Sequence, residues 1–243
     1  MKEKKPRIIF TAFKYSIPIL LGYSAIGAAF GLLVADAGYP WWLSLLMSSA
    51  MFAGAGQYIA VGLFAAGTSI WEAALVQLVV NARHIAYGLS MINHLPVRGF
   101  YKIYCIFGMT DETFALLSSL PGDENDAIHI PGLAQPIPAS SRGRFMFLVT
   151  LLDQSYWICG SVIGAVAGTL LPINTEGIGF ALTALFIVLM LEQILKVRKP
   201  GIFIVSAIPA VLGVLFLPSR ISLLAALALA LAISSLMGKR ARA

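Results

Sequence analysis

Charged side chains are scarce in this sequence, and their scarcity excludes a water-soluble globular protein. Only 12% of the 243 residues are Asp, Glu, Lys or Arg, whereas about 25% is usual for a soluble domain. Hydrophobic residues make up 59% of the chain, so the few charges could not cover a globular surface. The composition predicts an all-α polytopic integral membrane protein that lies in a lipid bilayer.

The sequence also lacks the signatures of catalysis and of metal or cofactor binding. The two cysteines, Cys105 and Cys159, stand alone in apolar runs without C-x-x-C or histidine-rich spacing. It contains no G-x-S-x-G motif, no H-E-x-x-H motif and no Asp-rich metal motif. We therefore predict no metal, no cofactor and no enzymatic activity. The enzyme hypothesis that remains is an intramembrane transferase or hydrolase using Asp111 and Glu112.

The charges that are present lie beside the apolar runs. The net charge is +6, and basic residues cluster at 2–7, 94–102, 142–144, 196–199 and 239–242. Basic segments next to membrane spans favour the cytoplasmic side, so both termini are predicted to be cytoplasmic. This distribution does not favour nucleic acid as a partner. The basic start precedes no A-x-A-like cleavage site, so we interpret 8–35 as a membrane helix and not as a signal peptide.

The apolar runs predict about seven membrane helices, with a range of six to eight, in one transporter domain over 1–243. They cover 8–35, 42–70, 71–93, 103–120, 145–171, 177–195, 201–217 and 221–237. A weak internal repeat suggests halves at roughly 8–120 and 143–237. Its clearest trace is Gly27-x-x-x-Gly31, which is matched by Gly160-x-x-x-Gly164. Small residues at this spacing allow helices to pack closely.

The run 71–93 carries Asn81, Arg83 and His84 near its middle. An arginine at the bilayer centre costs roughly 2.5–3.5 kcal/mol, so its side chain is expected to face the protein interior or a wet cavity. On one continuous helix, Gln77, Asn81, His84 and Gly88 would share a stripe, and Arg83 would face another way. This pattern indicates a substrate or proton site. The alternative is a buried ion pair that only fixes helix packing.

Two runs are predicted to be interrupted. Near 52–58, Gly54 and Gly56 flank a small residue before Gln57, which weakens a helix; a straight helix with small packing residues is the alternative. Near 108–113, the adjacent Asp111 and Glu112 point about 100° apart, so one can pair with Arg83 while the other takes a proton. A short interfacial loop there is the alternative. The basic clusters require an even number of crossings across each run, which favours both interruptions.

In matching order, several segments between about residues 15 and 165 resemble the AzlC family, the large permease subunit of bacterial branched-chain amino-acid exporters. The resembling pieces are Phe30-Gly31, Met47-Ser48 through Gln57, Asn81-Ala82-Arg83-His84 with Tyr87-Gly88, Thr110-Asp111-Glu112, and Asp153 through Gly160. The resemblance implies export of leucine, isoleucine, valine and also methionine across the bacterial plasma membrane by proton exchange. It also implies a small membrane partner of the AzlD type.

Our hypothesis is an alternating-access secondary transporter. An amino acid needs a cationic or dipolar partner for its carboxylate and an acceptor for its ammonium group. The expected substrate-binding residues are Gly54, Gly56, Gln57, Asn81, Arg83 and Tyr87. The expected proton-coupling residues are His84, Asp111, Glu112 and Asp153, where His84 is suited to titrate near neutral pH. A channel or a purely structural membrane subunit is the main alternative.

Overall fold

The computed structural model describes residues 8–120, 127–130 and 136–171, together with isolated positions between 187 and 216. In these ranges it contains eight α-helices, and its only β-type pairing is a single bridge between Ile128 and Ile137. The helices are α1 (Ile8–Asp36), α2 (Trp41–Ala50), α3 (Ala55–Ala65), α4 (Ile70–Val80), α5 (Ala82–Met91), α6 (Phe100–Phe107), α7 (Asp111–Ser118) and α8 (Ala139–Leu170). Two of them, α1 and α8, are long and apolar enough to cross a membrane.

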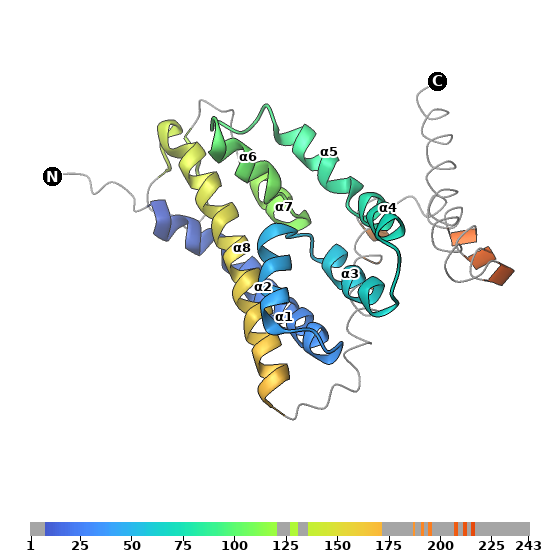
Figure 1. Cartoon of the computed structure of the whole chain (residues 1–243). Coiled ribbons are helices and arrows are strands. Elements are labelled where there is room, and N and C mark those ends of the chain that lie inside the picture. The colour runs from blue at the N-terminus through green and yellow to red at the C-terminus, as the bar shows by residue number, and fades with distance from the viewer. Residues whose placement is uncertain are drawn as a thin grey trace, which may run out of the picture.

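The helices α1 and α8 form the central pair, and α2, α3, α6 and α7 pack against it (Figure 1). The helices α4 and α5 pack farther out, against α3, α6 and α7. The two glycine motifs face each other. A Cβ atom at Gly31 would lie 2.0 Å from the Ser161 carbonyl oxygen, and one at Gly164 would lie 2.0 Å from that of Ala28. No side chain fits at either position, so the backbones are in direct contact. Residue numbers rise together along this contact, so α1 and α8 run parallel.

The chain enters a helical hairpin after α1. Ser44 donates a hydrogen bond to the Ser161 carbonyl oxygen (3.3 Å), and Gln154 donates one to that of Ser49 (3.0 Å). Because these contacts move back along α8, α2 runs antiparallel to it and stops near its middle. α3 then returns, and the Phe64 ring lies 6.3 Å from that of Tyr39 at the end where α2 began.

The reversal between α2 and α3 requires left-handed backbone. Phe52 has φ 39° and Gly54 has φ 46°, a region that side chains rarely adopt. The interruption predicted near 52–58 is therefore confirmed, and the straight-helix alternative is wrong. The pair has the geometry of a re-entrant hairpin.

The next two helices cross back to the opposite end. Ser69 and Glu72 form a capping box that starts α4. Our prediction of one continuous helix over 71–93 is wrong at Asn81, where φ −91° and ψ 2° end α4 and begin α5. The residue is compatible with this conformation because asparagine competes with helical hydrogen bonding. The predicted polar stripe is consequently divided between two helices.

A second hairpin, α6–α7, enters from the other end of α8. The Tyr104 ring packs 5.3 Å from that of Phe147, and Gly108 lies against Thr150 at the turn. α7 then returns, because Tyr15 donates to the Leu116 carbonyl oxygen (3.1 Å) near the start of α8. The interruption predicted near 108–113 is confirmed, since α6 ends at Phe107 and α7 begins at Asp111.

Both hairpins return to the end at which they entered, which agrees with the even crossing numbers expected from the basic clusters. The segments 94–102 and 142–144 lie together, because a Cβ atom at Gly143 would approach the Pro96 carbonyl oxygen to 2.5 Å. The start of α1 lies at the same end, where the Tyr15 and Phe145 rings are 5.6 Å apart. The spans predicted at 177–195, 201–217 and 221–237 lie outside the described residues, so the helix number and the repeat remain predictions.

Candidate functional site

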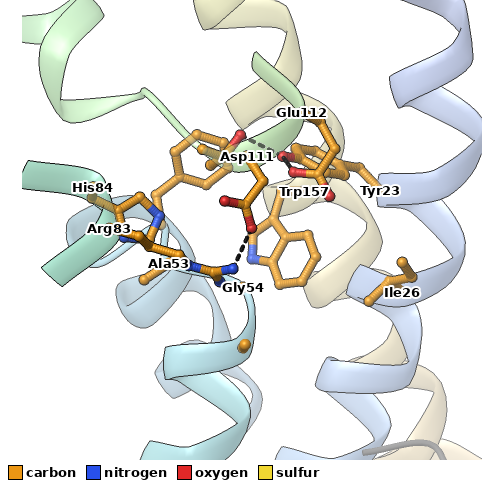
Figure 2. A pocket seen from close by; sticks show the side chains of 12 residues that line it. Tyr23, Ile26, Ala53, Gly54, Arg83, His84, Asp111, Glu112 and Trp157 are labelled. Carbon is orange, nitrogen blue, oxygen red and sulfur yellow. Dashed lines mark hydrogen bonds and ion pairs between the residues drawn. The ribbon is translucent and has the colours of Figure 1, made fainter. Parts of the chain in front are cut away.

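All three interruptions meet midway along α1 and α8, and a pocket lies where they meet. Its walls come from α1, the α2–α3 tip, α5, the start of α7 and α8: Tyr23, Ile26, Phe52, Ala53, Gly54, Ala55, Arg83, His84, Thr110, Asp111, Glu112 and Trp157. Figure 2 shows Arg83 and His84 on one side, Tyr23 and Glu112 on the other, and Asp111 between them. The pocket therefore combines cationic, acidic and aromatic side chains.

The cationic side is organised by Arg83. Its Nη1 lies 2.5 Å from Asp111 Oδ2, and the Tyr87 hydroxyl donates to Asp111 Oδ1 at 2.5 Å. Both oxygens of this carboxylate are thus occupied, and the pair links α5 to α7. Arg83 and Asp111 are only 30% and 26% exposed, so water screens their attraction weakly. Of the two adjacent acids, Asp111 is the one that pairs with Arg83.

Glu112 points the other way, toward α1. The Tyr23 hydroxyl donates to its Oε2 at 2.7 Å and also lies 2.6 Å from Thr110 Oγ1. Thr110 caps α7 by accepting from the Thr113 amide, and the Thr113 hydroxyl donates to Asp153 Oδ2 at 2.8 Å. Asp153 is fully buried and does not line the pocket, although it is connected to it.

Three of the predicted substrate-binding residues support the pocket from outside its wall. Gln57 is fully buried, where it accepts from the Ala53 amide and donates to Ser48. Gln77 donates to the Gly56 carbonyl oxygen at 2.8 Å, and Asn81 donates to Gln77 at 2.9 Å. These contacts hold the α2–α3 tip against α4.

Gly56 leaves room for the side chains of Gln77 and Asn81 because it has no side chain of its own. A Cβ atom there would lie 2.8 Å from Asn81 Oδ1 and 2.9 Å from Gln77 Oε1, so a larger residue would require these two side chains to shift. Of the ten predicted site residues, the structure places five on the pocket wall, namely Gly54, Arg83, His84, Asp111 and Glu112.

Two hydrogen-bond donors of the pocket residues are buried and have no partner among the described residues. They are the Nε of Arg83 and the indole Nε1 of Trp157. Buried donors normally find an acceptor, and leaving one unpaired costs about 1–3 kcal/mol. The α3 N-terminus also faces the pocket through Gly54 and Ala55, with no acidic residue in its first turn. This side of the pocket is therefore suited to an anionic group.

The cavity is small in this conformation. Its volume is about 50 Å³, compared with roughly 150 Å³ for a cavity that accommodates benzene. It accommodates a few water molecules or a small polar head group. A substrate with a branched aliphatic side chain requires the walls to move apart.

Sequence reasoning missed Tyr23, Thr110 and Trp157 as site residues. Tyr23 and Trp157 lie on the two long helices, and only the contact between those helices brings their rings to 5.4 Å. The signal for Thr110 was available, since a threonine three residues before Thr113 and next to two acids is a common N-cap pattern. Among the described residues, no group of three or more His, Cys, Asp or Glu side chains could hold a metal ion.

Comparison with known proteins settles the family. The model of the family described as "AzlC protein" matches residues 18–171, a range that contains every pocket residue. The chain belongs to the AzlC family. This confirms the resemblance found in the sequence motifs.

Relatives of this AzlC-family chain are named as membrane or transport proteins. The "Branched-chain amino acid transport protein AzlC" of Bacillus subtilis is 36% identical over 189 residues, covering 78% of this chain and 69% of the relative. An uncharacterized membrane protein of Helicobacter pylori is 38% identical over 182 residues, covering 75% and 74%. "Inner membrane protein YgaZ" of Escherichia coli is 29% identical over 221 residues, covering 87% and 83%. No solved structure matches the chain.

Proposed function

We propose that this AzlC-family protein is a secondary transporter that exports branched-chain and similar small apolar amino acids in exchange for protons. The observation that carries the proposal is the pocket between the α2–α3 tip, the Asn81 break and the start of α7. Interrupted helices that meet midway between two long helices are typical of substrate sites in transporters. The name of the Bacillus subtilis relative supports the substrate class.

The proposed position of the substrate carboxylate is beside Gly54, Arg83 and Trp157. The N-terminal end of α3 carries a partial positive charge, although the amides of Gly56 and Gln57 already donate to the Ala53 and Gly54 carbonyl oxygens. Arg83 Nε and Trp157 Nε1, which lack a partner within the described part of the chain, add two donors. Arg83 itself stays close to neutralised by Asp111, which limits the affinity for inorganic anions and favours a zwitterion.

The substrate ammonium group is assigned to the opposite side, at Glu112. Its Oε2 is held by Tyr23, and the carboxyl group lines the pocket. The apolar side chain of the substrate then lies against Ile26, Phe52 and Trp157, which form the non-polar wall. Because the cavity holds about 50 Å³, we assign the described conformation to a closed state of an alternating-access cycle.

The cellular setting follows from the basic segments and from the family. Residues 94–102 and 142–144, at one end of the molecule, are proposed to face the cytoplasm, together with both termini. We place the protein as a multi-pass protein in a bacterial plasma membrane. A small membrane subunit of the AzlD type is proposed as its partner.

Leucine flux in proteoliposomes tests this proposal. The full chain is reconstituted with and without the small partner, and leucine counterflow is measured against leucine concentration. Saturable counterflow that Arg83→Gln abolishes, while Arg98→Gln in the exposed loop leaves it intact, supports the transporter. Flux that does not saturate would indicate a channel. The absence of leucine movement in both preparations contradicts the proposal.

A further inference from the structure

An unbroken series of hydrogen bonds joins the carboxyl groups of Glu112 and Asp153. Glu112 Oε2 lies 2.7 Å from the Tyr23 hydroxyl, which lies 2.6 Å from Thr110 Oγ1. Thr110 Oγ1 lies 3.0 Å from Thr113 Oγ1, which lies 2.8 Å from Asp153 Oδ2. Each of these four distances is within the range of a hydroxyl hydrogen bond.

The hydroxyl groups of this series carry fewer protons than the series has hydrogen bonds. Three hydroxyl groups supply three protons for four hydrogen bonds. If both carboxyl groups are ionised, one of the four bonds has no proton. A single additional proton, on either Glu112 or Asp153, completes the whole series.

We propose that Glu112 and Asp153 share one proton, which moves between them through Tyr23, Thr110 and Thr113. With the proton on Glu112, each hydroxyl donates toward Asp153. Thr113 then gives its proton to Asp153 and takes one from Thr110. Tyr23 supplies Thr110 and takes the proton of Glu112.

After this transfer Asp153 is protonated, Glu112 is ionised, and each hydroxyl again carries one proton. All four bonds are retained with reversed polarity, so no buried group loses its partner. The inference rests on the proposed function, because it assigns the proton path of that transporter.

The series leads from the pocket wall into the interior of the protein. Glu112, Tyr23 and Thr110 line the pocket, whereas Thr113 and Asp153 are fully buried behind it. The second oxygen of Asp153, Oδ1, is buried without a partner among the described residues and is available to accept a hydrogen bond. A proton can thus leave the pocket without entering the space that the substrate occupies.

The other charged groups around the pocket are excluded from the path by their contacts. Asp111 uses both oxygens for Arg83 and Tyr87. His84 lies on the Arg83 side, where its Nδ1 is 3.3 Å from the Asn81 carbonyl oxygen. Among the described residues, neither Asp111 nor His84 forms a hydrogen bond with any of the three hydroxyl groups, so the series runs beside the ion pair and not through it.

The test uses Thr113→Val, which preserves the side-chain shape and removes the hydroxyl that donates to Asp153. The full chain and its small partner are reconstituted in proteoliposomes that contain a pH-sensitive dye. Leucine–leucine exchange and pH-driven leucine transport are measured together with proton flux. We expect Thr113→Val to retain exchange and to lose pH-driven transport about a hundredfold, the lower end of the usual effect of a positioned proton-transfer group. Thr113→Ser should restore it.

Tyr156→Phe is the matched control, because it also removes a buried hydroxyl group. That hydroxyl forms a 2.9 Å hydrogen bond with Ser16 and joins α8 to α1. This control should behave as wild type. If Thr113→Val does not fold, Tyr23→Phe tests the relay in its place. This variant should lower the number of protons moved per leucine. Wild-type coupling in both variants overturns the relay, as does equal loss of exchange and pH-driven transport in Thr113→Val. Wild-type protein without leucine exchange overturns the proposed function itself.

Discussion

The tips of the α2–α3 and α6–α7 hairpins line the same pocket, but their chemistry is opposite. The α2–α3 tip reverses through left-handed backbone at Phe52 and Gly54, and it ends at a helix N-terminus without side-chain caps or acids. The α6–α7 tip has no left-handed residue, and its helix starts with the Thr110 cap and two acids. The difference separates a dipolar side suited to anions from an acidic side suited to ammonium groups and protons.

The largest loss of stability is expected when the Arg83–Asp111 ion pair, which joins the two sides of the pocket, is broken. Asp111→Asn leaves the half-buried Arg83 without its counter-charge, and we expect about 2–3 kcal/mol of destabilisation. The thermal unfolding midpoint in detergent should fall. The double variant Asp111→Asn/Arg83→Gln should recover part of this loss. If the single and double variants unfold alike, the ion pair has no structural role.

The next effect concerns the backbone of the α2–α3 tip. Gly54→Ala places a side chain at φ 46°, which should cost about 1–3 kcal/mol and reduce leucine binding. Gly62→Ala, inside α3 with no atom within 4 Å of the added Cβ, is the control and should be neutral or stabilising. Equal unfolding midpoints for the two variants would show that the tip conformation is unimportant.

A smaller loss of stability is expected when the N-cap of α7, on the acidic side of the pocket, is removed. Thr110→Val removes the hydroxyl that accepts from the Thr113 amide, at a cost of about 1 kcal/mol. Thr110→Ser retains the cap and should unfold at nearly the wild-type temperature. A serine variant as unstable as the valine variant would assign the effect to packing.

The smallest effect is expected at Tyr87. Tyr87→Phe removes one hydrogen bond to Asp111, which keeps Arg83, so about 0.5–1.5 kcal/mol of stability is lost. Leucine affinity should change little, because Tyr87 does not line the pocket. A large rise in the leucine concentration for half-maximal counterflow would instead place this hydroxyl in the binding site.

Local chemistry predicted the two hairpins, but not how their tips are held. The glycines around Ala55 and the acids at the start of α7 each disfavour an unbroken apolar helix, so both breaks were readable. The break at Asn81 was not, because Gln77, Asn81 and His84 keep a helical spacing across it. Tyr23 and Trp157 were missed for a different reason. Their roles depend on how α1 crosses α8, which is a property of tertiary packing.

The glycine contact between α1 and α8 has a mechanical consequence. Side chains interlocked at a helix interface can change rotamer and let helices slide, but backbones in direct contact have no such intermediate layer. We therefore expect the central pair to act as one rigid frame in the proposed transport cycle, with the hinges at the three interruptions around it. Spin labels on α1 and α8 should keep a constant separation throughout turnover, while labels on the two hairpin tips move relative to them.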